Sequence, residues 1–221
     1  MVENQTTSRR KFIRKAAGAT VFGTAAVGAS GVVSALKRKV SVGTLGNQSS
    51  PARMHYKLWT TGTIQPNGSL ESNDGVYNSG GTHYAHGEVK EGTAVDKYTF
   101  NGHVKKIVVY TITSDYNTYV RFDISGDLDY GGHDRLDFIG YNGGILDQNK
   151  WGVRGDNAVF SKPGDGSLES NDIIDKRYAR GACYDGGHDH VNMKNEFERI
   201  DLLSAFGSTK IEMVRYMHSE W

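Results

Sequence analysis

The heptapeptide Gly-Ser-Leu-Glu-Ser-Asn-Asp occurs twice in this chain of 221 residues, at positions 68–74 and 166–172. The sequence that follows also aligns with itself, because 84–87 matches 178–181, 96–109 matches 189–202 and 118–122 matches 209–213. The offset falls from 98 residues at the heptapeptide to 91 at the last match, as a few loop deletions would cause. We infer a duplicated unit of roughly 60 to 70 residues, too short to bury its apolar face well without packing against its twin.

The composition predicts that this unit is all-β. Glycine is abundant, tyrosine is the commonest aromatic residue and proline is scarce, which favours short strands joined by tight turns. Residues 118–124 alternate apolar and polar side chains, as in a half-buried strand. We expect duplicated antiparallel β-sandwich-like units at 56–125 and 155–221, joined by a connecting insertion at 126–154. Strands of the first unit are expected at 56–64, 83–90, 95–100, 104–112 and 118–124.

The N-terminal residues 1–35 resemble a twin-arginine signal peptide. Ser-Arg-Arg-Lys-Phe-Ile-Arg at 8–14 precedes an uncharged and mildly apolar stretch, and Val33-Ser34-Ala35 offers small residues for a signal peptidase. An uncleaved N-terminal anchor is the alternative. Residues 36–55 are basic and then rich in Gly, Asn and Ser, which is typical of a linker. The chain is therefore expected to be secreted by twin-arginine translocation, with no membrane contact after cleavage.

Charge and cysteine content narrow the classes of function. The 26 basic and 25 acidic residues nearly balance, so no basic footprint predicts a nucleic-acid partner. The single cysteine, Cys183, excludes an internal disulfide and a cysteine-based zinc knuckle. It aligns with Val89, which predicts a small buried residue and not a nucleophile. The sequence contains no nucleophile elbow, phosphate loop or metalloprotease helix, so a non-catalytic role is favoured over an enzyme.

The heptapeptides offer oxygen ligands for a hard cation, and structural calcium is the cofactor that they suggest. The candidate ligands are Glu71, Asn73, Asp74, Glu169, Asn171 and Asp172. The alternative is a turn in which Ser, Asn and Asp side chains bond their own backbone.

His188 and His190 suggest a different metal. Side chains at positions i and i+2 project from the same face of a strand, a geometry found in zinc sites on β-sheets. Asp185 or Asp189 would be a ligand or would orient one. A third ligand would come from His83, His86, His103 or His133. The alternative interpretation is that His188 and His190 lie on an exposed strand and bind no metal.

Aromatic side chains exceed what such a small core needs, and those on outward faces would stack on sugar rings. Trp59, Tyr119 and Trp151 are the candidate ligand-binding residues. The alternative is that the tyrosines cover the rim of a sandwich.

The first repeat contains Ser72-Asn73-Asp74-Gly75-Val76, then Gly87-Glu88-Val89, then the pattern GTxxDxYxFxGxV from Gly92 to Val104. In this order the residues resemble a small β module that recurs in twin-arginine-exported proteins of haloarchaea, often at the end of secreted hydrolases. The resemblance covers the first unit well and the second in part. It implies an exported β domain and assigns no catalytic residue.

Together these observations predict a secreted, non-catalytic β-sandwich protein that binds a polysaccharide or a cell-envelope glycan. One alternative is a small secreted metal-dependent hydrolase that uses His188 and His190. The other is a surface-structural or antagonistic secreted protein that acts through protein contacts.

Overall fold

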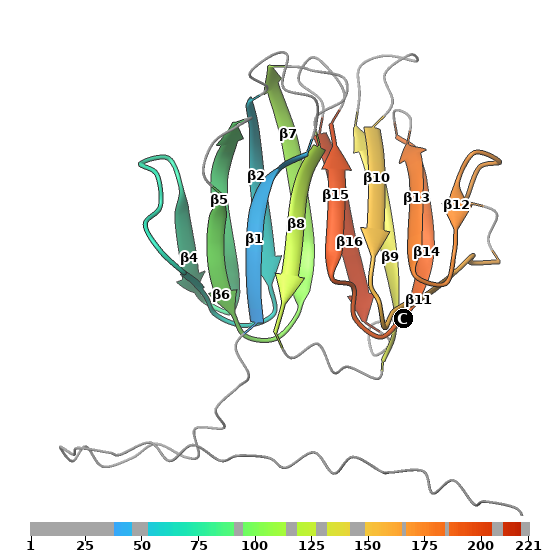
Figure 1. The fold of residues 1–221 in the computed structure, drawn as a ribbon, viewed down its shortest axis with the longest axis horizontal. Coiled ribbons are helices and arrows are strands. Elements are labelled where there is room, and N and C mark those ends of the chain that lie inside the picture. Colours follow the sequence, from blue (N-terminus) through green and yellow to red (C-terminus); the bar gives the residue numbers. More distant parts are fainter. Residues whose placement is uncertain are drawn as a thin grey trace, which may run out of the picture. The chain divides into compact units, whose positions relative to one another are not determined.

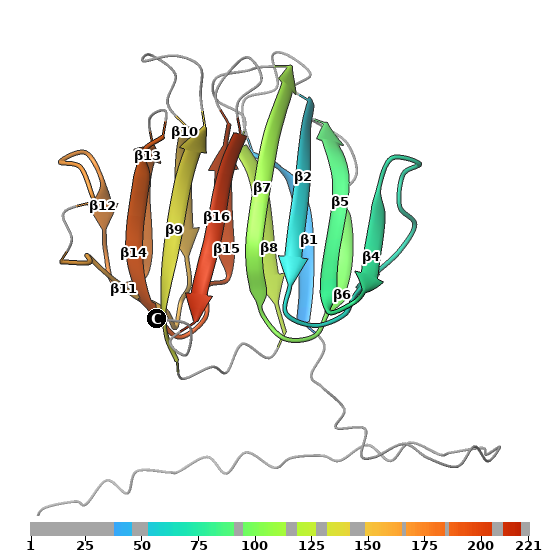
Figure 2. The same cartoon turned by 180° about the vertical axis from the view of Figure 1, so that it is seen from behind.

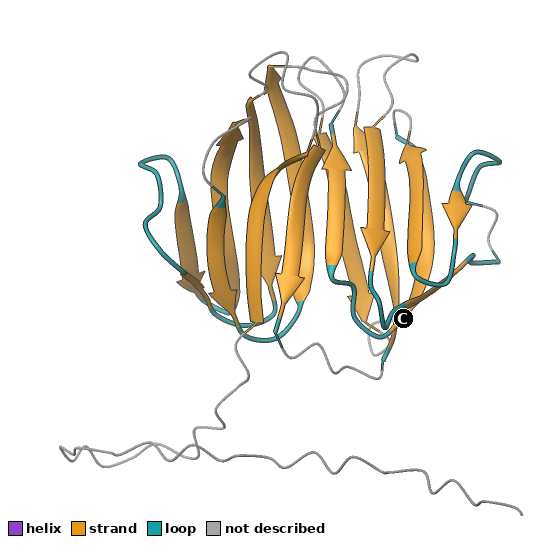
Figure 3. Cartoon of the chain, in the orientation of Figure 1, coloured by secondary structure: helices purple, strands orange, loops and turns teal. Residues whose placement is uncertain are grey.

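Alternation of apolar and polar residues builds strands throughout the chain (Figure 3). The structure is a computed structural model and describes residues 38–45, 53–90, 95–113, 119–126, 132–141, 149–164, 167–183, 186–204 and 210–217. These ranges contain sixteen strands and no helix. The strands are β1 (Arg38–Leu45), β2 (Arg53–Thr60), β3 (Ile64–Pro66), β4 (Gly75–Ser79), β5 (Thr82–Lys90), β6 (Asp96–Phe100), β7 (Val104–Thr113), β8 (Tyr119–Ser125), β9 (His133–Tyr141), β10 (Asn149–Arg154), β11 (Val159–Ser161), β12 (Ile173–Ile174), β13 (Tyr178–Cys183), β14 (His188–Lys194), β15 (Arg199–Leu203) and β16 (Lys210–Met217).

The described strands form two sheets of eight strands each. Sheet A has the order β12-β13-β10-β15-β8-β1-β6-β3, and sheet B has the order β11-β14-β9-β16-β7-β2-β5-β4. The pairings in both sheets are antiparallel. Sheet A is the nearer sheet in Figure 1 and sheet B is the nearer sheet in Figure 2. The inward side chains of both sheets form one continuous core, in which Leu58, Phe122 and Ile200 have no exposed surface.

The two repeats are related by pseudo-twofold symmetry. β1–β8 form the first repeat, β9–β16 form the second, and each strand matches the one eight places later. Half of sheet A comes from each repeat, and the same is true of sheet B. The sheets continue across the junction because β8 pairs with β15 and β7 pairs with β16. The predicted all-β fold with duplicated sandwich units is therefore confirmed.

Matching turns of the two repeats share one unusual backbone conformation. Gly102, between β6 and β7, has a φ of 73°, and its partner Asn195, between β14 and β15, has a φ of 66°. A Cβ atom at Gly102 would lie 2.2 Å from the hydroxyl oxygen of Thr61. The first turn therefore requires glycine, whereas asparagine, which tolerates this conformation better than most residues, occupies the second.

The boundaries of the repeats differ from those expected. The range 36–55, expected to be a linker, contains β1, whose Val40 and Val42 are buried in the core. The range 126–154, expected to connect the units, contains β9 and β10 of the second repeat. Each repeat is therefore longer than the alignment indicated, because three strands precede the heptapeptide: β1–β3 in the first repeat and β9–β11 in the second. The strands expected at 83–90, 95–100, 104–112 and 118–124 correspond to β5, β6, β7 and β8.

The expected signal segment, residues 1–35, lies outside the described residues. Within the described ranges, no helix is long and apolar enough to cross a membrane.

Candidate functional site

Three aromatic side chains lie in one row on the outer face of sheet B. Tyr77 in β4 is opposite Tyr84 in β5, and Tyr84 is opposite Trp59 in β2. The ring centroids of Tyr77 and Tyr84 are 5.1 Å apart with an interplanar angle of 19°, and those of Tyr84 and Trp59 are 5.9 Å apart. We call these three residues the aromatic band. The alternation of β2 positions Trp59 outward, because the residues on either side of it, Leu58 and Thr60, are buried.

Two lysines accompany the aromatic band. The Nζ atom of Lys57 lies 3.8 Å from the ring centroid of Tyr84 and 4.9 Å from that of Trp59. The Nζ atom of Lys106 lies 5.6 Å from the Trp59 centroid and 2.7 Å from a carboxylate oxygen of Glu212. Lys57 forms no ion pair with any carboxylate in the described ranges. The band therefore combines exposed ring surface with an ammonium group that can donate hydrogen bonds to a ligand.

Tyr119 and Trp151, the other two aromatic candidates, lie elsewhere. Tyr119 is half-buried on the outer face of sheet A, on the opposite side of the sandwich from Trp59. Trp151 is 2% exposed, its ring stacks on Phe138 at 4.2 Å, and its Nε1 donates a hydrogen bond of 2.6 Å to Asp189. The strand therefore points most of the Trp151 side chain into the core, and the contribution of Trp151 to a ligand platform stays a prediction.

Each heptapeptide forms a turn that its own final aspartate closes. The backbone N of Asp74 donates to the carbonyl oxygen of Glu71 at 3.1 Å, and the backbone N of Glu71 donates to Asp74 Oδ2 at 3.0 Å. The same two bonds between Asp172 and Glu169 measure 3.2 and 2.7 Å. These are the hydrogen bonds of the turn alternative.

The candidate calcium ligands do not converge in the described residues. Glu71, Asn73, Glu169 and Asn171 are exposed, whereas the side chains of the two aspartates turn toward the interior. No group of three or more His, Cys, Asp or Glu side chains in the described ranges could hold a metal ion.

In the first repeat, a buried aspartate that was not predicted to be a site residue faces the heptapeptide. Asp96 of β6 accepts a hydrogen bond of 2.8 Å from the Tyr56 hydroxyl, and Tyr56 also lies 2.6 Å from the hydroxyl of Tyr98. Burial raises the pKa of Asp96 to about 6. The hydrogen bond from Tyr56 lowers this pKa, and the negative charges of Asp74 and Glu71 raise it. The carboxyl groups of Asp74 and Asp96 therefore lie close together in a poorly solvated site at the end of the core.

The second repeat contains the matching pair, Asp172 and Asp189. Trp151 replaces Tyr56 as the donor, and the Sγ atom of Cys183 donates to Asp189 Oδ2 at 3.1 Å. Burial raises the pKa of Asp189, the two donors lower it, and the charge of Asp172 raises it. Asp172 Oδ1 is buried and has no hydrogen-bond partner in the described ranges. The sequence did contain one feature that could have identified Asp96 and Asp189 as site residues. Both aligned segments, 96–109 and 189–202, begin with an aspartate.

His188 and His190 lie on the outer face of sheet B in the second repeat, with ring centroids 6.3 Å apart. His190 Nε2 is 3.6 Å from Asp137 Oδ2, but Asp137 is already bound by Arg135 at 2.6 and 2.9 Å. Asp189 points away from them into the core, and Asp185 lies outside the described residues. The described residues bring no third ligand to the expected zinc centre.

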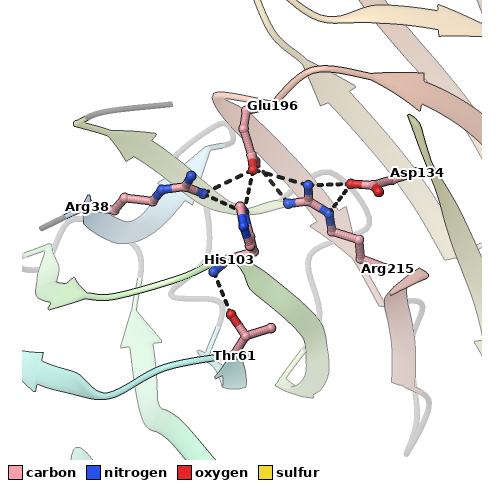
Figure 4. Close-up of polar contacts among 6 residues, drawn as sticks. All are labelled: Arg38, Thr61, His103, Asp134, Glu196 and Arg215. Carbon is pink, nitrogen blue, oxygen red and sulfur yellow. Dashed lines mark hydrogen bonds and ion pairs between the residues drawn. The ribbon is translucent and has the colours of Figure 1, made fainter. Parts of the chain in front are cut away.

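A buried ionic cluster joins the two repeats at one end of the sandwich (Figure 4). Glu196 lies at its centre and accepts hydrogen bonds from Arg38 at 3.0 Å and from Arg215 at 2.9 Å. Arg215 also donates to Asp134 at 2.7 Å, and His103 Nδ1 is 2.6 Å from Glu196 Oε1. Burial raises the pKa of Glu196, but the His103 hydrogen bond and the two arginines outweigh it and lower this pKa to about 2. We call these five residues the junction cluster.

Four of the five residues of the junction cluster occupy matching places in the two repeats. His103 matches Glu196 in the aligned segments. Arg38 is opposite Phe100 and Asp134 is opposite Met193, and Phe100 and Met193 also match, so Arg38 corresponds to Asp134. In these two pairs of matching positions the first repeat carries Arg38 and His103, whereas the second carries Asp134 and Glu196, and the second repeat adds Arg215 from β16. The cluster fastens the repeats together and is not accessible to a ligand.

Comparison of the chain with protein-family models, with curated proteins and with solved structures finds no match.

Proposed function

We propose that this chain is an exported, non-catalytic binding protein that holds a polysaccharide on the aromatic band. The observation that carries the proposal is the row of Tyr77, Tyr84 and Trp59 across three neighbouring strands, with 45% of the Tyr77 surface exposed. Aromatic rings stack on the apolar faces of sugar rings, and phenol and ammonium groups donate hydrogen bonds to sugar hydroxyls. A row that crosses strands suits an extended polymer better than a compact ligand.

The rigidity of the band supports the same proposal. Trp59 and Tyr84 lie on inner strands of sheet B and Tyr77 lies on β4 at its edge, and ring contacts and the two lysines hold the side chains in place. Binding then orders few groups in the protein, which reduces the entropic cost of association. The export part of the proposal rests on the twin-arginine motif at 8–14.

Affinity electrophoresis of the full chain in gels that contain soluble neutral polysaccharides tests the binding. We expect retardation by at least one polymer, and a loss of about tenfold or more in affinity for Trp59→Ala and for Tyr84→Ala. Tyr178→Ala is the matched control, since Tyr178 is the counterpart of Tyr84 in the second repeat, is 41% exposed and lies on the other sheet. Equal losses in all three variants, or no retardation by any polymer in a broad panel, would overturn the proposal.

Export is tested separately in a host with a twin-arginine pathway. Replacing Arg9 and Arg10 with lysines should leave the chain inside the cell, whereas the unchanged chain appears outside. Export of both forms alike would contradict this part of the proposal.

A further inference from the structure

The outer face of sheet A carries a shallow hollow, on the opposite side of the sandwich from the aromatic band, whose lining comes from the second repeat and from Tyr119 in β8 of the first. Its volume is about 250 Å³, and its polar lining comes from Tyr119, Lys150, Asn171 and Arg180. The remaining lining residues are Trp151, Ile173, Gly181 and Ala182. Among the described residues, the lining of the hollow thus has two cationic side chains and no carboxylate.

The registers explain how this arrangement forms. Lys150 of β10 is opposite Ala182 of β13, and Arg180 of β13 is opposite Ile173 of β12. Asn171 comes from the second heptapeptide, which leads into β12. Three neighbouring strands and one turn therefore direct these side chains to a single place on the sheet.

The matching positions of the first repeat carry different side chains. The place of Lys150 and Ala182 is taken there by His55 and Glu88, which are opposite each other in β2 and β5. Glu88 is 6% exposed and accepts ion pairs from Arg53 at 2.7 Å and from Lys90 at 3.4 Å. In the second repeat alanine replaces this carboxylate and lysine replaces the histidine. The pair of opposed positions in the second repeat therefore carries a lysine and no carboxylate.

Asp201, a carboxylate close to Tyr119, is already engaged. Burial raises the pKa of Tyr119, Asp201 raises it further and Arg180 lowers it, so both charged groups lie close to the phenol. Arg121 binds Asp201 with two hydrogen bonds of 2.7 and 2.9 Å. Neither Lys150 nor Arg180 forms an ion pair within the described ranges.

We propose that this hollow binds a sugar unit that bears a carboxylate or a sulfate, with Lys150 and Arg180 contacting the oxyanion. Arginine presents several donors in a planar fork and lysine adds a second charge, while the Asn171 amide can donate to a sugar hydroxyl. The Tyr119 ring offers an apolar surface for the sugar. The hollow is open, which suits a unit within a polymer. It is independent of the aromatic band, so two polymer chains can be held on opposite faces of one molecule.

The test uses the full chain with polygalacturonate, dextran sulfate and uncharged dextran, measured by isothermal calorimetry at low salt. We expect binding to at least one anionic polymer. Lys150→Gln combined with Arg180→Gln should weaken the affinity for the anionic polymer about tenfold or more, because both charged hydrogen bonds to the oxyanion are lost. Ala182→Glu, which restores the carboxylate of the first repeat, should weaken it similarly. The two anionic polymers distinguish a carboxylate ligand from a sulfate ligand.

Lys39→Gln combined with Lys97→Gln is the matched control, because both lysines are exposed on the outer face of sheet A in the first repeat. This pair removes the same charge and should change the affinity less than twofold. Binding of anionic polymer that survives Trp59→Ala belongs to the hollow and not to the aromatic band. Equal weakening by the control pair, unchanged affinity in the Lys150 and Arg180 variant, or no binding of either anionic polymer would overturn the proposal.

Discussion

His103 and Glu196 occupy the same position in the two repeats and meet each other, with 2.6 Å between Nδ1 and Oε1. Residues that match in a twofold arrangement can touch only near the axis that relates them. The junction cluster therefore lies on the pseudo-twofold axis, where β6–β7 and β14–β15 turn back into the sandwich.

Glu196→Ala should destabilise the chain by about 3–5 kcal/mol, because it leaves Arg38 and Arg215 buried without their shared carboxylate. Urea denaturation monitored by circular dichroism measures this change. Asp123→Ala is the control, since Asp123 is 44% exposed and pairs with Arg199 at the surface, where an ion pair contributes about 1 kcal/mol or less. If the two variants lose similar amounts of unfolding free energy, the buried cluster stabilises the chain no more than a surface ion pair does.

Asp96 should make the stability depend on pH. Its pKa in the folded chain is about 6, above the ordinary value of 3.8, so protonation favours the folded state. This contribution is fully present below 3.8 and is lost as the pH rises through about 6. Asp96→Asn cannot ionise, so its melting temperature relative to the unchanged chain should rise between pH 4 and pH 8. A difference that stays constant with pH would contradict the assignment.

Gly181→Ala should destabilise the chain by about 1–3 kcal/mol through overpacking. A Cβ atom there would lie 2.3 Å from Asp172 Oδ1 and 2.6 Å from the Trp151 ring. Gly152→Ala, on the neighbouring strand, is the natural comparison, because its Cβ would meet nothing closer than 3.9 Å. Thermal denaturation should separate the two variants. If both variants lose stability equally, contact of the new methyl group with Asp172 and Trp151 does not explain the loss in Gly181→Ala.

Cys183 should resist alkylation in the folded chain. Burial and the neighbouring Asp189 raise the pKa of its thiol, and its surface is 2% exposed. Iodoacetamide at pH 8 should therefore label it at the rate of unfolding, and rapidly once urea is added. Mass spectrometry follows the reaction. Fast labelling without denaturant would mean that the thiol reaches solvent in the native state.

Much of the fold could be predicted because its information is local or repeated. The alternation in 118–124 assigned β8, and the matches at 84–87 and 96–109 aligned β5, β6 and part of β7 with strands that do correspond in space. β1 was missed because Gly43 and its basic start weaken a short alternating pattern in which Val40 and Val42 carry the core face. Its stability comes from pairing with β6 and β8, which are distant in the sequence.

The candidate site was less predictable, since residue type does not specify which face of a strand a side chain occupies. Trp59 and Trp151 are chemically identical, yet one lies on the surface and the other replaces Tyr56 in the core. The alignment stopped short of β2 and β10, where the difference would have been visible. The hollow beside Arg180 depends on the replacement of Glu88 by Ala182, which acquires meaning only when the sheet registers are known.

The continuity of both sheets across β8–β15 and β7–β16 has a consequence for the origin of the chain. One repeat by itself would leave β7 and β8 as open edges, and a second copy would have to cover them. An ancestor with a single repeat would thus have been a homodimer, with identical residues facing each other across its symmetry axis. Joining two such repeats in one chain removes that constraint. In a single chain the two matching positions can differ, and here His103 and Arg38 of one repeat stand where the other repeat carries Glu196 and Asp134, so that opposite charges meet near the axis.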